Sequence, residues 1–135
     1  MADISSGGCQ CGVVRYEIAG PIDDVALCHC RMCQKAHGAP AVAWLVVARK
    51  SFRLLKGTVA SYRSSDNARR EFCRDCGTPL FFVEASRPDD FDVALSTLDD
   101  PVNHGPDRHI WVESQMPWLK LADHLPQFLR ETVKD

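Results

Sequence analysis

Short apolar segments rich in β-branched and aromatic residues recur along the chain, and polar or turn-forming residues separate them. None of these segments exceeds eight residues, which suits strands better than helices. Residues 41–48 are apolar without interruption, as is typical of a strand buried on both faces. The pattern predicts strands at residues 13–18, 25–27, 41–48, 52–55, 59–63, 80–83, 91–95 and 110–112.

The connections between these segments add turns and very little helix. Lys56, Gly57 and Thr58 stand between two strand segments and predict a hairpin. Residues 33–38 have room for a single helical turn, and residues 127–133 for a short helix after a proline. Because the chain has no internal repeat or linker, we expect one domain over residues 1–135. This domain should be mainly β, built from small sheets or a small barrel.

The overall composition excludes several classes of protein. Of the 135 residues, 45% are hydrophobic and 25% are charged, which are ordinary values for a globular chain and exclude a disordered one. Sixteen Lys and Arg against eighteen Asp and Glu leave a formal net charge of -2, so a nucleic-acid partner has no electrostatic support. We expect the adjacent Arg69 and Arg70 to lie on the solvated surface.

No segment has the features of a membrane span or a secretion signal. The longest apolar stretch, residues 39–48, is too short to cross a bilayer as a helix. The first residues lack the charged and apolar regions of a signal peptide. We therefore expect a cytoplasmic protein with no membrane partner, whose cysteines stay reduced and act as metal ligands or catalytic groups.

The seven cysteines are the unusual feature of the sequence, and they lie in three groups. The groups are Cys9 with Cys11, then Cys28, Cys30 and Cys33, and finally Cys73 with Cys76. A glycine follows the first and the third group directly and lets the chain turn tightly. Thiolates at this spacing are typical zinc ligands. The alternatives are a redox pair in the third group, or buried cysteines that only pack.

Seven ligands divide most simply into four and three. Four thiolates make a closed, structural zinc site, whereas three leave the open position of a catalytic zinc. Spacing favours a closed site of Cys9, Cys11, Cys73 and Cys76, and an open site of Cys28, Cys30 and Cys33. The competing division combines Cys30 and Cys33 with Cys73 and Cys76 as a zinc ribbon. His29 is a further candidate ligand, although an extended turn would direct its side chain away.

Four motifs, found in the same order, make the chain similar to a known family. They are residues 7–16 (GGCQCGVVRY), 28–35 (CHCRMCQK), 72–81 (FCRDCGTPLF) and 109–118 (HIWVESQMPW). On these motifs the chain resembles the glutathione-dependent formaldehyde-activating enzymes, also called the centromere protein V family. The resemblance implies an Mss-four-like β-tent fold, mainly β, with small antiparallel sheets and a structural zinc. It also implies two zinc ions per chain, divided between the cysteines as spacing favours.

The family's reaction adds the thiol of glutathione to formaldehyde. The resemblance therefore implies a zinc-dependent carbon–sulfur lyase or ligase that acts on a glutathione or other thiol–aldehyde adduct. The open zinc would bind the thiol and lower its pKa. His29 and His109 are candidates for proton transfer, Arg31 and Lys35 for binding the carboxylates of glutathione, and Trp118 for a wall of the site.

Two other classes of function fit parts of the sequence. The first is a zinc-stabilised binding or chaperone-like module without catalysis. The second is a redox enzyme of the methionine sulfoxide reductase type, which needs a nucleophilic cysteine outside the metal sites. The substrate stays open, because Gln115 stands where the family often has a lysine. The oligomeric state stays open as well.

Overall fold

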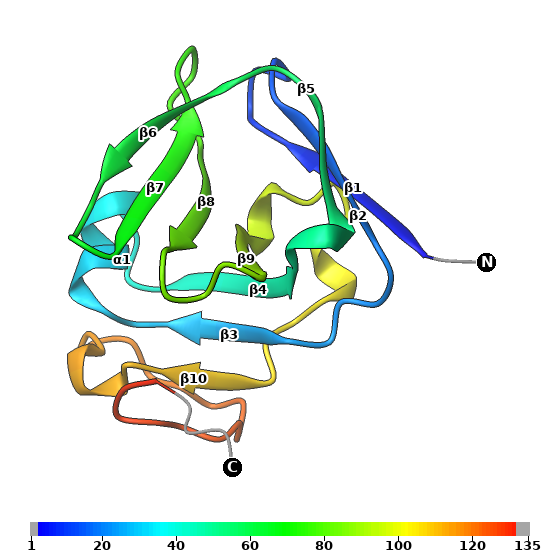
Figure 1. The fold of residues 1–135 in the computed structure, drawn as a ribbon. Helices are drawn as coiled ribbons and strands as arrows, with labels where there is room; N and C mark the ends of the chain where they lie inside the picture. Colours follow the sequence, from blue (N-terminus) through cyan, green and yellow to red (C-terminus); the bar gives the residue numbers. More distant parts are fainter. Residues whose placement is uncertain (1–2, 132–135) are drawn as a thin grey trace.

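The computed structural model describes residues 3–131, which form two β-sheets, one short α-helix and several single 3₁₀ turns (Figure 1). The strands are β1 (Ile4–Gly8), β2 (Arg15–Ala19), β3 (Val25–Cys28), β4 (Val42–Ala48), β5 (Phe52–Lys56), β6 (Val59–Arg63), β7 (Ala68–Cys73), β8 (Pro79–Glu84), β9 (Asp90–Ala94) and β10 (Arg108–Ile110). The helix α1 (Arg31–His37) follows β3. The chain is mainly β, as the sequence predicts.

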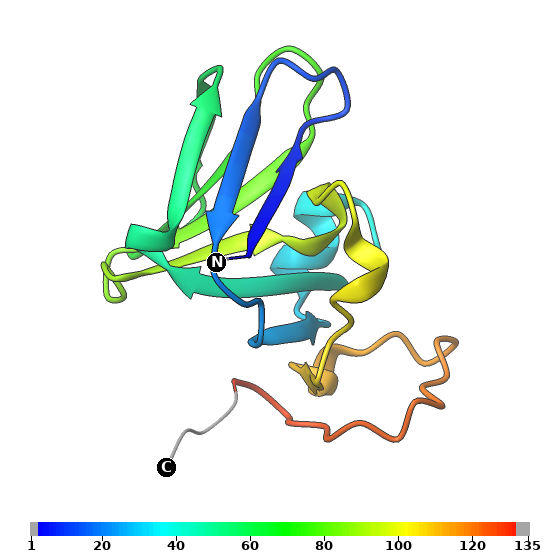
Figure 2. The same ribbon diagram turned by 90° about the vertical axis from the view of Figure 1, so that its right-hand side faces the viewer.

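The strands are divided between a small sheet and a large one. The small sheet has the order β1-β2-β5, and the large sheet has the order β10-β3-β4-β9-β8-β7-β6. All pairs are antiparallel except β10 with β3, which are parallel. In Figures 1 and 2 the strands β6 to β8 rise steeply from the level of β3 and β4, and the small sheet stands opposite them. The two sheets thus enclose a space between them.

The main hydrophobic core fills that space. Tyr16 and Ile18 of β2 are fully buried and pack in one cluster with Leu45, Leu80 and Val93 of the large sheet. Burial of each large apolar side chain there stabilises the folded state by about 1.5–3 kcal/mol. Aromatic rings of Tyr16, Phe52, Phe81 and Phe91 stack or meet edge to face within this cluster. The small sheet is therefore fixed to the large one by packing.

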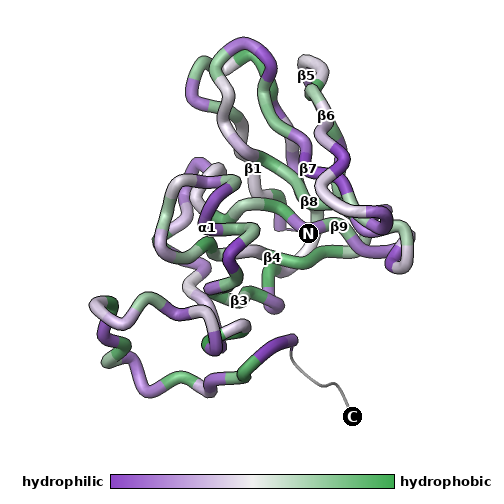
Figure 3. Tube along the Cα trace, turned by 90° about the vertical axis from the view of Figure 1, so that its left-hand side faces the viewer, coloured by the Kyte–Doolittle hydropathy of each residue, from purple (hydrophilic) through white to green (hydrophobic). Residues whose placement is uncertain are grey.

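Strand β4 is buried on both faces, as its uninterrupted apolar sequence predicts. Leu45 and Val47 face the main core, whereas Val42 and Trp44 belong to a second buried cluster on the other face. Figure 3 shows green, apolar colour along much of β4. Among residues 3–131, no helix is long and apolar enough to span a membrane.

The predicted hairpin around Gly57 is wrong. Strand β5 pairs with β2 and β6 pairs with β7, so residues between them carry the chain from the small sheet to the large one. Gly57 has a φ of 83° and lies directly against the backbone carbonyl of Val13, where any side chain would clash. The glycine is required by this close approach and not by a two-strand turn.

The predicted C-terminal helix is also wrong where the structure describes it. Residues 127–131 run beside β10, and the Phe128 N–H donates to the His109 carbonyl while the His109 N–H donates to Pro126. The exposed edge of β10 thus supplies the backbone partners that a helix would otherwise provide. Residues 132 and 133 of that prediction lie outside the described residues. Strand β1, with its sequence Ile-Ser-Ser-Gly-Gly, carries too weak a pattern to be predicted.

Candidate metal centres and the adjoining cavity

Four cysteines from two distant turns meet beside the main core. Cys9 and Cys11 lie in the turn from β1 to β2, whereas Cys73 ends β7 and Cys76 lies in the turn to β8. Their four sulfur atoms all lie within 4.8 Å of one another. We call this group the closed cluster. It brings together the four residues that spacing assigns to one site.

Each turn of the closed cluster directs backbone N–H groups at sulfur. Gly12 and Gly77 have positive φ angles, which let the chain fold back tightly. The Val14 N–H donates to Cys9 Sγ at 3.2 Å, and the Cys76 N–H donates to Cys73 Sγ at 3.5 Å. Such donors stabilise thiolate charge around a metal.

A second group of sulfurs lies where β3 meets α1. Cys28 ends β3, Cys30 caps the helix and Cys33 lies in its first turn, with all three sulfurs within 4.8 Å of one another. We call this group the open cluster. The three thiols share hydrogen bonds, which together with the nearby charge of Arg70 lower the pKa of Cys33 and raise that of Cys28. Cys33 is therefore the member of the cluster that loses its proton first.

Gln34 holds the loop of the open cluster in place. Its buried side-chain amide donates to the carbonyl oxygens of His29 at 2.8 Å and Ser114 at 3.1 Å. Because Ser114 belongs to the segment after β10, this one side chain joins two distant parts of the chain. The loop is therefore preorganised by contacts outside the cluster.

Both clusters fit zinc by their donor chemistry and spacing. In a tetrahedral site with Zn–S bonds of about 2.3 Å, neighbouring sulfurs lie about 3.8 Å apart. Cys11 and Cys73 Sγ are 3.8 Å apart, and Cys9 and Cys11 Sγ are 3.5 Å apart. Among the described residues, no metal-sized group combines cysteines of α1 with Cys73 and Cys76, as the zinc-ribbon division would require.

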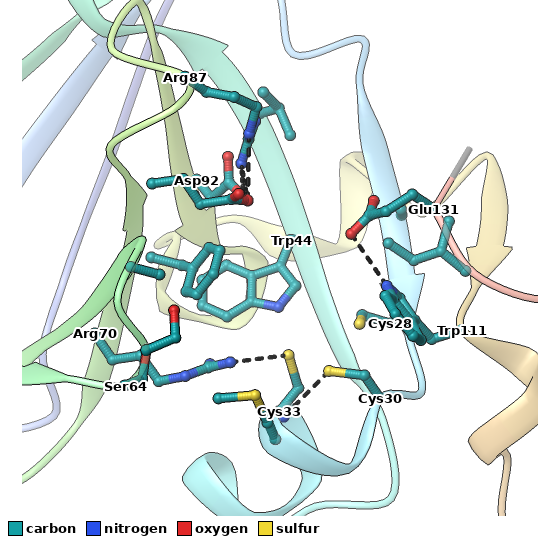
Figure 4. A pocket seen from close by; sticks show the side chains of 18 of the residues that line it. Cys28, Cys30, Cys33, Trp44, Ser64, Arg70, Arg87, Asp92, Trp111 and Glu131 are labelled. Atoms are coloured by element: carbon teal, nitrogen blue, oxygen red, sulfur yellow. Dashed lines mark hydrogen bonds and ion pairs between the residues drawn. The ribbon is translucent and has the colours of Figure 1, made fainter. Parts of the chain in front are cut away.

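A cavity of about 810 Å³ adjoins the open cluster and not the closed one (Figure 4). The lining residues of each strand are two positions apart and therefore point to the same side of the large sheet. One face of this sheet thus forms the floor of the cavity. Trp44 and Phe82 form apolar parts of the wall. All three sulfur-bearing residues of the open cluster, Cys28, Cys30 and Cys33, line this cavity.

Arg70 is a lining residue that sequence reasoning missed. It lies on β7, and its guanidinium reaches Cys33 Sγ at 3.6 Å and packs on the ring of Phe82 (Figure 4). The expectation of a solvated Arg70 is therefore wrong. Among the described residues, its Nη1 has no hydrogen-bond partner, and neither has the hydroxyl of the neighbouring Ser64. Arg70 thus offers a cation beside the open cluster.

Two buried histidines, His29 and His109, form a hydrogen-bonded chain with the exposed carboxylate of Asp123. His109 Nε2 lies 2.7 Å from Asp123 Oδ2, and His29 Nε2 lies 3.0 Å from His109 Nδ1. In a neutral His109 whose Nε2–H donates to the carboxylate, Nδ1 accepts from the Nε2–H of His29. Neither imidazole lines the cavity, so direct proton transfer to a molecule there is not supported.

The remaining predicted residues have separate environments. Arg31 lines the cavity and donates to Gln34 Oε1 at 2.7 Å. Lys35 is exposed and lines a different, neighbouring pocket. Trp118 is 67% exposed and lines neither, so the structure gives no support to its role as a wall. Gln115 donates to the Leu119 carbonyl.

Comparison with known proteins agrees with the fold and the motifs. A crystal structure of a Rhodobacter sphaeroides protein has a TM-score of 0.58 and 24% identity, over 70% of this chain and 87% of that one, which supports the fold alone. A protein of Schizosaccharomyces pombe described as an uncharacterised lyase is 30% identical over 77 residues. That match covers 57% of this chain and 56% of the relative, so the chain spans little more than half of it.

The match to a family is broader than either of these likenesses. A family model described as glutathione-dependent formaldehyde-activating enzyme matches residues 4–114, which include all seven cysteines and β1 to β10. The resemblance inferred from the four motifs is thereby confirmed. The chain belongs to the glutathione-dependent formaldehyde-activating enzyme family.

Proposed function

We propose that this protein is a zinc-dependent carbon–sulfur lyase or ligase acting on the adduct of an aldehyde with glutathione or a related thiol. The observation that carries the proposal is the open cluster, whose three cysteines line a cavity of about 810 Å³. A cavity of this volume accepts a small organic molecule. Membership of the family and a relative described as a lyase support an enzyme in general.

The two clusters would serve different purposes. Cys9, Cys11, Cys73 and Cys76 would hold a structural zinc, and Cys28, Cys30 and Cys33 a second zinc with one open position. When bound, the second ion supplies a site for the substrate thiol and lowers the pKa of that thiol. Because all seven cysteines belong to the two clusters, none is left as the free nucleophile of a redox enzyme.

The residues around the open cluster would bind and orient the reactants. In the forward reaction the thiol sulfur bonds to the carbonyl carbon, the carbonyl π bond breaks, and its oxygen gains negative charge. The Arg70 guanidinium, close to Cys33, would stabilise that oxygen until a proton from the thiol reaches it through solvent. The reverse reaction passes through the same charge. Trp44 and Phe82 would pack against the apolar parts of the reactants.

The experiment is a rate measurement on the zinc-loaded protein. Exchange between glutathione, formaldehyde and S-hydroxymethylglutathione is followed by NMR, with the uncatalysed rate as reference. Acceleration by the native protein, and its loss in Cys30→Ala with the melting temperature largely kept, is the expected result. A rate equal to the uncatalysed one with several thiols and aldehydes would contradict the proposal.

The second candidate is a binding module without catalysis. The His29–His109–Asp123 chain favours it, because these polar groups hydrogen-bond to one another and are absent from the cavity. In that case Cys30→Ala would melt the domain and change no rate.

Seven reduced thiols also favour a reducing compartment, and we propose the cytosol.

A further inference from the structure

The cavity has a second polar end, away from the open cluster, where Asp92 lies (Figure 4). Asp92 is on β9, and the residue is buried, with 7% of its surface exposed. Its Oδ2 accepts from Arg87 Nη2 at 2.8 Å, whereas its Oδ1 has no hydrogen-bond partner among the described residues. A buried carboxylate oxygen without a partner is costly, so a ligand that donates to it would gain free energy.

Three carboxylates share one guanidinium at this end of the cavity. The Arg87 guanidinium contacts three carboxylates, those of Asp92, of Glu84 at 3.0 Å and of Asp90 at 3.6 Å. Burial raises the pKa of Asp92 to about 6, although Arg87 acts in the opposite direction. A bound cation would therefore stabilise the ionised form.

A metal ion is the less suitable occupant. Among residues 3–131, the groups of acidic, histidine or cysteine side chains close enough to share an ion are the two cysteine clusters. Within the described part of the chain, the end of the cavity near Asp92 offers one buried carboxylate oxygen without a partner. One strong acceptor in a negative environment suits an ammonium group, which donates hydrogen bonds and carries charge.

The strand register gives the distance between the two ends. Val46 pairs with Asp92, and its N–H donates to the carbonyl of Asp24, four positions before Cys28. Four residues along a strand cover about 13 Å, and two strand spacings from β3 to β9 add about 10 Å across the sheet. The Cα atoms of Asp92 and Cys28 are therefore about 16 Å apart, and the side chains of both residues line the cavity between them. In a γ-glutamyl-cysteine unit eight bonds separate the amine nitrogen from the sulfur, which is about 10 Å when extended and equals the span of three extended residues.

We propose that Asp92, positioned by Arg87, forms a subsite for the primary ammonium group of a peptide-like thiol whose sulfur reaches the open cluster. The sulfur end rests on the proposed function, whereas the ammonium end rests on Asp92 and the cavity. Glutathione, with an amine at the end of a tripeptide-sized chain, has the required form. A thiol without an amine would lose this contact.

Calorimetry on the zinc-loaded protein tests the subsite. The probes are glutathione, N-acetylglutathione, and the γ-glutamyl-alanyl-glycine tripeptide, which has the amine and lacks sulfur. We expect glutathione to bind at least about tenfold more tightly than N-acetylglutathione, and Asp92→Asn to abolish that ratio. Asp107→Asn is the matched control, because Asp107 also pairs with an arginine but does not line the cavity.

Each outcome decides one of the two proposals. If the sulfur-free tripeptide binds in an Asp92-dependent way while no thiol is turned over, the subsite stands and the proposed reaction fails. If thiols are turned over but acetylation and Asp92→Asn change no affinity, the subsite is overturned and the reaction stands. If the native protein binds none of the three probes, both are overturned. Asp92→Glu, which keeps the charge, distinguishes a lost contact from a misfolded variant.

Discussion

Removing the closed cluster should destabilise the protein much more than removing the open one. The perturbation is the double variant Cys73→Ala with Cys76→Ala, compared with Cys30→Ala and Cys33→Ala. Each pair removes one buried and one half-buried cysteine, so the packing loss is similar. Each leaves too few sulfurs in its cluster to hold zinc firmly.

The magnitude follows from the length of chain that each ion closes into a loop. Cys11 and Cys73 are 62 positions apart, and in the chain-entropy model a cross-link over that distance stabilises by about 4 kcal/mol. Cys28 and Cys33 are five positions apart, which gives about 2 kcal/mol in the same model. Domains of this size are stable by only about 5–15 kcal/mol, so the first loss is a large share of the total.

Urea unfolding of the zinc-loaded variants, with zinc content measured on the same samples, is the assay. We expect the closed-cluster variant to lose about 2 kcal/mol more than the open-cluster variant, and to approach the native protein treated with a strong chelator. Equal losses, or a larger loss in the open-cluster variant, would refute the assignment of structural and catalytic sites.

Three further predictions test single residues. Arg70→Met should lower kcat about 100-fold, because it removes the cation beside the reacting oxygen, whereas Arg63→Met, exposed on the neighbouring strand, should leave kcat unchanged. When the pH is raised from 5 to 7.5, the free energy of unfolding in urea should fall by about 1 kcal/mol more for the native protein than for Asp92→Asn. The sign follows because folding raises the pKa of this acid from 3.8 to about 6, so its stabilisation is complete below 3.8 and is lost as the pH rises to 6. Asp123→Asn should lower the melting temperature in thermal scans without reducing zinc content, since it weakens a contact of His109 outside both clusters; an unchanged melting temperature would contradict this.

Local signals predicted most of the strands and the membership of each cysteine group. Each tight turn at Gly12 and Gly77 is determined by residues next to the cysteines, so the short spacing within a cysteine pair can be interpreted without knowing the fold. The meeting of Cys11 with Cys73 depends on how two sheets pack, and spacing alone left a zinc ribbon as an alternative. Only the family resemblance favoured one division strongly before the structure was known.

The polar residues of the cavity were harder to predict. Arg70 stands in a charged stretch that resembles solvated surface, and only its register opposite Phe82 on the sheet turns it inward. Asp92 could have been singled out from the sequence, because it is a charged residue that interrupts the apolar segment 91–95. The hairpin prediction at Gly57 fails for a physical reason. A glycine needed for close approach looks the same in sequence as one needed for a hairpin.

A crystal structure of the zinc-loaded protein soaked with glutathione tests the central claim most directly. The account predicts two zinc ions, one with Cys9, Cys11, Cys73 and Cys76 as its four ligands, and one with Cys28, Cys30, Cys33 and the sulfur of glutathione. A single zinc ion, or a second ion whose fourth ligand is another protein side chain, would contradict it.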